Sequence, residues 1–184
     1  MRVTGGIIGR REIRSPKGDV RPTQDKVRAA LFNSLGEAVA GARVLDLFAG
    51  SGALGLEAWS RGASHVCWVE SDRRVFQTLE ENVKLLCSGE GGGTELRQAD
   101  ALAFLKGGWA AEPFHLILAD PPYGEVGAAE LLLALEERGS LAPGGVLVFE
   151  QRASEPALER AGWEILRDRT YGGTRLVMYR REAP

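Results

Sequence analysis

The sequence has few of the residues on which disulfide and metal chemistry depend: its 184 residues include two cysteines and two histidines. Cys67 and Cys87 cannot form a disulfide framework or a cysteine-rich zinc site. The histidines have no partners at metal-ligand spacing, so we expect no bound metal. No apolar run is long enough to cross a bilayer, and the basic N-terminus lacks the apolar segment of a signal peptide. We therefore expect a cytoplasmic protein with no membrane partner.

The composition is that of an ordinary globular domain, with 44% hydrophobic and 26% charged residues. The formal net charge is −2, but it is unevenly distributed. Residues 1–28 carry eight Lys and Arg against three acidic residues, and residues 160–181 carry six Arg against two. Two basic ends around an acidic middle suggest contact with a polyanion, although two solvated basic segments would give the same charge pattern.

The middle of the chain alternates short apolar runs with amphipathic stretches, which predicts a Rossmann-like, doubly wound α/β fold with a largely parallel sheet. The expected strands are Arg43–Phe48, His65–Glu70, Glu95–Ala99, Phe114–Ala119 and Gly145–Glu150. The expected helices are Ala53–Arg61, Asp72–Leu86, Ala101–Leu105, Ala128–Arg138 and Glu155–Ala161. Two further strands, Trp163–Tyr171 and Thr174–Arg181, are joined by two glycines. This hairpin signal brings the sheet to seven strands and predicts that the last one is antiparallel.

Residues 1–24 do not fit this alternation. Two short runs, Val3–Ile8 and Arg11–Arg14, suggest a small hairpin within a basic extension. A helix should follow from about Gln24 to Leu35, with Thr23 as its N-cap. We therefore divide the chain into an extension, residues 1–24, and a main domain, residues 25–184.

A glycine motif follows the first strand of the main domain. Gly50, Gly52 and Gly55 match G-x-G-x-x-G between a strand and a helix, where glycines permit a tight turn and the close approach of a ligand. Glu70 lies twenty residues further on, at the end of the next strand, where its carboxylate can accept the hydroxyls of a ribose. Together these features predict a nucleotide-type cofactor.

Asp46 indicates which cofactor this is. It lies in the C-terminal half of the strand before the glycines, close to the place where a dinucleotide would put its diphosphate. An acid repels a diphosphate but attracts the ammonium and sulfonium of S-adenosylmethionine. A capping role for Asp46 is the alternative.

A second motif, Asp120-Pro121-Pro122-Tyr123, ends the fourth strand, where an α/β sheet faces its ligand crevice. The prolines stiffen the backbone and offer no N–H donors. The Asp120 carboxylate and the Pro121 carbonyl can therefore accept both hydrogens of an amino group on a planar ring, and Tyr123 can stack on that ring. A plain turn with a surface tyrosine is the alternative.

The two motifs together resemble those of the Class I S-adenosylmethionine-dependent amino-methyltransferases. More narrowly, the sequence resembles the bacterial RsmD-type small-subunit rRNA guanine-N2 methyltransferases. The resemblance extends over nearly the whole chain, and the segments that carry it are 18–36, 44–58, 69–70 and Asp120–Tyr123. It implies methylation of a guanine N2 in 16S rRNA within an assembling small ribosomal subunit.

The resemblance also implies a role for each matching residue. Asp46, Gly50 and Gly52 would line the methionine half of the cofactor, and Glu70 would bind the ribose. Asp100 would meet the adenine amino group, with Ala101 offering its N–H. The full expected cofactor set is Thr23, Asp46, Phe48, Gly50, Gly52, Glu70, Ser71, Asp100, Ala101 and Asp120. The expected catalytic set is Asp120, Pro121 and Tyr123, and the expected RNA-binding set is Arg10, Arg11, Arg14, Lys17, Arg21 and Arg28.

Two other functions remain open at this stage. Asp-Pro-Pro-Tyr also serves adenine-N6 and glutamine-N5 methyltransferases that act on DNA, tRNA or protein. No separate target-reading domain is visible, which argues against sequence-specific DNA methylation. An inactive nucleotide-binding module for assembly is the alternative outside enzymes.

Overall fold

The computed structural model describes residues 1–15, 22–89, 91–107 and 112–182. The strands are β1 (Arg43–Leu47), β2 (His65–Glu70), β3 (Gly93–Gln98), β4 (Phe114–Ala119), β5 (Leu141–Arg152), β6 (Trp163–Tyr171) and β7 (Thr174–Arg181). The α-helices are α1 (Pro22–Leu35), α2 (Ala53–Ser60), α3 (Arg73–Leu86), α4 (Ala101–Lys106) and α5 (Ala128–Arg138), and a 3-10 turn, η1, spans Gly36–Val39.

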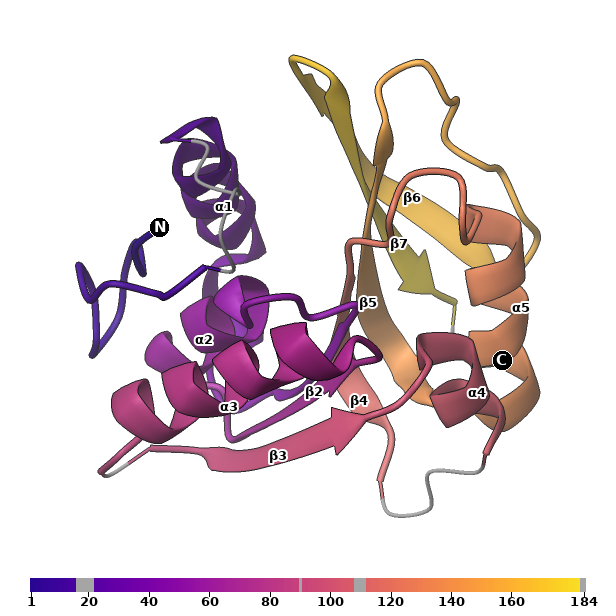
Figure 1. The fold of residues 1–184 in the computed structure, drawn as a ribbon. Helices are drawn as coiled ribbons and strands as arrows, with labels where there is room; N and C mark the ends of the chain where they lie inside the picture. Colours follow the sequence, from indigo (N-terminus) through magenta and orange to yellow (C-terminus); the bar gives the residue numbers. More distant parts are fainter. Residues whose placement is uncertain (16–21, 90, 108–111, 183–184) are drawn as a thin grey trace.

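The strands form one sheet in the order β3-β2-β1-β4-β5-β7-β6. The first five pair in parallel, and β7 runs antiparallel to both β5 and β6. Figure 1 shows α1 on one side of this sheet and α5 on the other. The predicted seven-stranded α/β fold with antiparallel C-terminal strands is thus confirmed.

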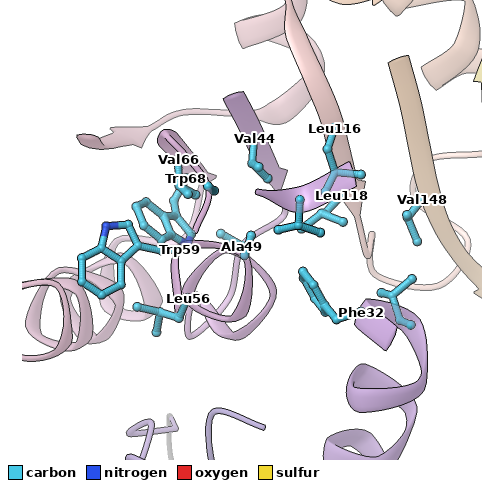
Figure 2. Packing of buried hydrophobic residues seen from close by; sticks show 14 of the residues in the cluster. Phe32, Val44, Ala49, Leu56, Trp59, Val66, Trp68, Leu116, Leu118 and Val148 are labelled. Atoms are coloured by element: carbon cyan, nitrogen blue, oxygen red, sulfur yellow. The ribbon is translucent and has the colours of Figure 1, made fainter. Parts of the chain in front are cut away.

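Each face of the sheet has its own hydrophobic layer. The layer under α1, α2 and α3 includes Phe32, Trp68 and Leu118, which Figure 2 shows from close by. The layer under α4 and α5 includes Leu105, Leu135 and other buried residues. Burial of both faces explains why β1, β2 and β4 read as nearly continuous apolar runs.

The N-terminal segment packs onto the first of these layers. Arg2 pairs with Glu12 in an antiparallel bridge, so the segment folds back as a small hairpin. Val3 and Ile13 are both 1% exposed and belong to the same cluster as α1 and α2. The extension is therefore anchored on the main domain by buried apolar side chains.

The sequence prediction fails in two places. No helix forms over residues 155–161: the carbonyls of Glu155 and Pro156 accept hydrogen bonds from Gln151, and the N–H of Leu158 donates to the Tyr179 hydroxyl. These tertiary bonds occupy groups that a helix would need for itself. The second error concerns the start of α1. The helix begins at Pro22, so Thr23 lies in its first turn and is not its N-cap.

Candidate functional site

The register of the sheet brings the ends of four strands level with one another. Leu47 pairs with Val69 of β2 and with Ala119 of β4, and Ala119 pairs with Phe149 of β5. The residues that follow these partners are Phe48, Glu70, Asp120 and Glu150. The two predicted motifs therefore meet at one edge, where an α/β fold binds its ligand.

The glycine motif forms the turn between β1 and α2. Gly50 and Gly52 have φ values of 56° and 84°, in the left-handed region that glycine adopts without strain. Phe48, at φ 57°, is a non-glycine residue in the same region, and such backbone is concentrated at functional sites. A Cβ on Gly55 would lie 2.1 Å from the Trp68 indole nitrogen. Gly55 thus serves the predicted close packing of helix on strand.

Asp46 is buried beneath this turn, at 1% exposure. One of its oxygens, Oδ2, accepts a hydrogen bond of 2.8 Å from the N–H of Gly55. Burial raises the pKa of the Asp46 carboxyl well above its usual value, the Gly55 N–H opposes the rise, and the charges of Asp120 and Glu70 add to it. The three acids therefore interact, and a bound cation would relieve their repulsion.

Glu70 closes the glycine turn from the side. Its Oε2 accepts from the Gly50 N–H and its Oε1 from the Asp72 N–H, both at 2.8 Å. A carboxylate can accept about four hydrogen bonds, so these two contacts leave capacity for the two hydroxyls of a ribose. They also fix the side chain beside the turn.

The remaining expected cofactor residues lie at neighbouring strand ends. Asp100 follows β3 as the N-cap of α4 and accepts from the Ala103 N–H at 2.8 Å. Ala101 is buried as the first residue of α4, and Ser71 is exposed just after β2. The side chain of Thr23 lies outside the described residues.

The Asp-Pro-Pro-Tyr segment forms a rigid corner after β4. Pro121 is buried, and the Pro122 carbonyl closes the turn by accepting from the Glu125 N–H at 3.1 Å. Tyr123 remains 44% exposed, and its hydroxyl is hydrogen-bonded to that of Thr174 at 3.0 Å. The Arg152 guanidinium carbon lies 5.2 Å from the centroid of the Tyr123 ring. The aromatic ring is thus held in place without being buried.

Comparison with known proteins gives the family. The sequence matches the family described as "Conserved hypothetical protein 95" over residues 1–180. The chain belongs to this family. It is 34% identical over 186 residues to Ribosomal RNA small subunit methyltransferase D of Escherichia coli K12, covering 100% of this chain and 91% of the relative. The Haemophilus influenzae protein of the same name is 35% identical, over 88% of this chain and 81% of its own length.

A solved structure from Escherichia coli supports the same assignment. It superposes with a TM-score of 0.88 at 34% identity, covering 100% of this chain and 99% of the other. The resemblance to the RsmD family that the sequence motifs suggested is confirmed.

Glu150 is a member of the site that the sequence analysis missed. In this RsmD-family chain it lies beside Asp120, one strand further along the sheet. Burial raises the pKa of Glu150 to about 8, the Asp120 charge adds to the rise, and a hydrogen bond with Thr174 opposes it. Its position at the end of an apolar strand, like that of Glu70, was the signal that could have identified it.

The raised pKa makes a prediction about stability. The folded protein holds this proton up to about pH 8, whereas the unfolded chain releases it near 4.5. Stability from this group is therefore fully present below pH 4.5 and is lost as the pH rises toward 8. As the pH rises from 5 to 8.5, we expect the stability of Glu150→Gln relative to the wild type to increase by on the order of a few kcal/mol. Urea unfolding of both proteins at both pH values measures this. A difference in unfolding free energy between variant and wild type that is the same at the two pH values would contradict it.

The six arginines and lysines expected to bind RNA differ in their exposure and in their partners. Arg10 and Arg11 are exposed, and Arg14 forms an exposed ion pair with Glu81. Arg28 is 4% exposed and pairs with Asp25 and Glu57, so the prediction that it meets RNA is wrong: its charge is already neutralised inside the protein. Lys17 and Arg21 lie outside the described residues.

Two asparagines have structural partners. Asn82, fully buried in α3, donates to the carbonyls of Ser51 and Arg14, and so links the glycine turn to the N-terminal segment. The sequence analysis did not identify it. Asn33, to which the sequence assigned no role, accepts a hydrogen bond from Arg61.

Two expected absences concern metals and membranes. Within the described ranges, His, Cys, Asp and Glu side chains do not gather into a group that could hold a metal ion. Among the helices of the same residues, none has the length and apolar character needed to cross a bilayer.

Proposed function

We propose that the chain is an S-adenosylmethionine-dependent methyltransferase that methylates the N2 amine of a guanine in 16S rRNA. The observation that carries the proposal is the convergence of Asp46, Glu70 and Asp120 at one edge of the sheet, with the Asp-Pro-Pro-Tyr corner beside them. Membership of the RsmD family, whose relatives are named as small-subunit rRNA methyltransferases, supports the substrate.

The residues of the site fit S-adenosylmethionine. A cationic ligand is favoured where the charges of Asp120 and Glu70 add to the raised pKa of Asp46, and this cofactor carries both an ammonium and a sulfonium. Asp46 and the turn at Gly50 and Gly52 would hold its methionine half. Glu70 would bind the ribose, and Asp100 with Ala101 would bind the adenine.

A test of the cofactor assignment is the affinity of Glu70→Ala. Hydrogen bonds to a charged group contribute about 1.5–3 kcal/mol, so S-adenosylmethionine should bind more weakly by that amount. Calorimetry measures the change, with Glu137→Ala, an exposed acid on α5, as the matched control. An unchanged affinity for Glu70→Ala would show that the ribose is bound elsewhere.

In this reaction the main task of the protein is to position a weak nucleophile. When bound, the cofactor supplies an electrophilic methyl group on sulfur. Asp120 and the Pro121 carbonyl would accept the two N–H groups of the target amine, aim its lone pair at the methyl and stabilise the positive charge that develops on nitrogen. As the N–C bond forms, the C–S bond breaks, and Asp120 or water then takes the surplus proton.

The target base must leave its stack to reach this corner. Tyr123, exposed and oriented by Thr174, would stack on the extruded guanine, an interaction worth about 1–3 kcal/mol per base. An assembling small subunit, in which the target nucleotide is still accessible, is the expected partner.

One experiment separates the candidate substrates. Labelled S-adenosylmethionine is supplied with naked 16S rRNA, assembled small subunits, tRNA and DNA, and the products are digested and identified. N2-methylguanine from the rRNA or the subunits is expected. N6-methyladenine, methylglutamine or no transfer at all would overturn the proposal.

A further inference from the structure

The outer strand β6 places two arginines on the face of the sheet that α1, α2 and α3 cover elsewhere. Directly paired residues of neighbouring strands point to the same face of a sheet. Leu176 and Met178 of β7 belong to the hydrophobic layer under those helices, and their partners on β6 are Arg169 and Arg167. Both arginines are exposed. The hydrophobic layer is therefore continued at the edge of the sheet by a positively charged surface.

This surface extends to the Asp-Pro-Pro-Tyr corner. Arg152 of β5 pairs with Thr174 of β7, two residues before Leu176, so both side chains point to the same face. The Arg152 guanidinium lies over one face of the Tyr123 ring, and Thr174 bonds the Tyr123 hydroxyl. We call Arg152, Arg167 and Arg169 the arginine face.

Three acids near the arginine face are neutralised, and Asp120 belongs to the corner where the target amine is expected. Glu164 pairs with Arg180 at 2.6 Å. Asp168 points to the opposite face of the sheet, where it pairs with Arg175 at 3.2 Å. Glu150 carries a proton at neutral pH, because burial beside Asp120 raises its pKa to about 8. The face therefore has a net positive charge next to the site of methyl transfer.

The N-terminal segment is less well placed for the same task. Ile7 and Ile8 hydrogen-bond to Ser60, the last residue of α2. The eight residues of α2 put Ser60 about 12 Å beyond the glycine turn at 1.5 Å per residue. Arg14, which is also exposed, pairs with Glu81 of α3. Arg10 and Arg11 of the expected RNA set come two and three residues after Ile8. Their charges therefore lie toward the end of α2 that is remote from the cofactor turn.

We propose that the RNA strand flanking the target guanine lies along the arginine face, with its phosphates on Arg167 and Arg169 and with Arg152 at the entrance to the Tyr123 platform. This inference rests on the proposed rRNA substrate. It assigns to β5 and β6 the RNA contact that the sequence analysis placed on the N-terminal basic residues. Phosphate contacts of this kind hold the strand and leave the choice of base to the corner itself.

Three double variants test the assignment, each removing two positive charges: Arg167→Gln/Arg169→Gln, Arg10→Gln/Arg11→Gln, and the control Lys106→Gln/Arg138→Gln. The control residues are exposed at the ends of α4 and α5, which cover the opposite face of the sheet. Fluorescence anisotropy with a labelled 16S rRNA fragment gives affinity at several salt concentrations. S-adenosylmethionine affinity reports that each variant is folded.

The first variant should bind RNA at least tenfold more weakly. It should also lower the slope of log affinity against log salt by roughly 1.4, the loss expected for two single-strand phosphate contacts. The other two variants should differ from the wild type less than threefold. Equal losses in all three variants, a loss confined to Arg10→Gln/Arg11→Gln, or no RNA binding by the wild type would overturn the arginine face.

The outcome is separable from that of the proposed function. If the wild type makes no N2-methylguanine but only the Arg167→Gln/Arg169→Gln variant loses RNA affinity, the reaction is wrong and the surface stands. If the wild type methylates guanine and that variant binds RNA normally, the surface is wrong and the reaction stands.

Discussion

Asp120→Ala should abolish methyl transfer while the protein stays folded. The side chain is exposed at the end of β4, so its removal leaves no cavity in either hydrophobic layer. What is lost is the acceptor that positions the target amine and stabilises its developing charge. Removing one such group typically costs 10²–10³-fold in kcat, and the loss of orientation adds to that figure. Single-turnover transfer of a labelled methyl group measures it.

Cofactor affinity provides the internal control for this variant. Asp120 raises the pKa of both Asp46 and Glu150, so its removal relieves repulsion within the site. S-adenosylmethionine should keep most of its affinity, because Asp46, the glycine turn and Glu70 would still hold it. Asp120→Asn, which keeps one acceptor oxygen, should retain more activity than Asp120→Ala. An Asp120→Ala enzyme with normal turnover would show that another group positions the amine.

The sequence was most informative where local pattern decides structure. β2, β4, β6 and β7 have the predicted bounds, because apolar runs and turn glycines are properties of consecutive residues. The same holds for the positions of Gly50, Glu70 and Asp120 at strand ends. In a parallel sheet, the end of a strand is already the edge that binds ligand, so these residues could be grouped before the register was known.

Features that depend on distant partners could not be predicted in the same way. Arg28 reads as a surface residue of α1, and its burial depends on Glu57, 29 positions away. The helix expected over residues 155–161 is absent because Gln151 and Tyr179 bond its backbone. Glu150 acquires its raised pKa only from the β4–β5 register that sets it beside Asp120.

Glu57 is the residue through which the N-terminal segment is fastened to the main domain. It is fully buried in α2 and bonds four groups. Its Oε2 accepts from the Thr4 N–H at 2.7 Å and from Arg28 at 3.4 Å, and its Oε1 accepts from the Thr4 hydroxyl at 2.6 Å and from Arg61 at 2.8 Å. One carboxylate thus joins residues 1–4, α1 and the end of α2.

Removing the Glu57 carboxylate should destabilise the protein, because buried polar groups lose their hydrogen-bond and ion-pair partner. In Glu57→Ala, Arg28 stays 4% exposed with Asp25 as its remaining acidic partner, and the Thr4 N–H loses its acceptor. Breaking a buried ion pair by removing one partner typically costs 3–5 kcal/mol. We expect the free energy of unfolding to fall by about that amount in urea titrations. Trypsin should also cleave earlier at Arg10 and Arg11, since the segment has lost its anchor.

Glu81→Ala is the matched comparison, because it also removes a carboxylate that pairs with an arginine of the N-terminal segment. Glu81 and Arg14 are both 61% exposed, so water replaces the lost partner and the cost should stay below about 1 kcal/mol. If Glu57→Ala were no more destabilising than Glu81→Ala, the buried network would contribute no more than an exposed pair. The N-terminal segment would then be held mainly by the burial of Val3 and Ile13 and by hydrogen bonds to Ser60 and Asn82, rather than by charge.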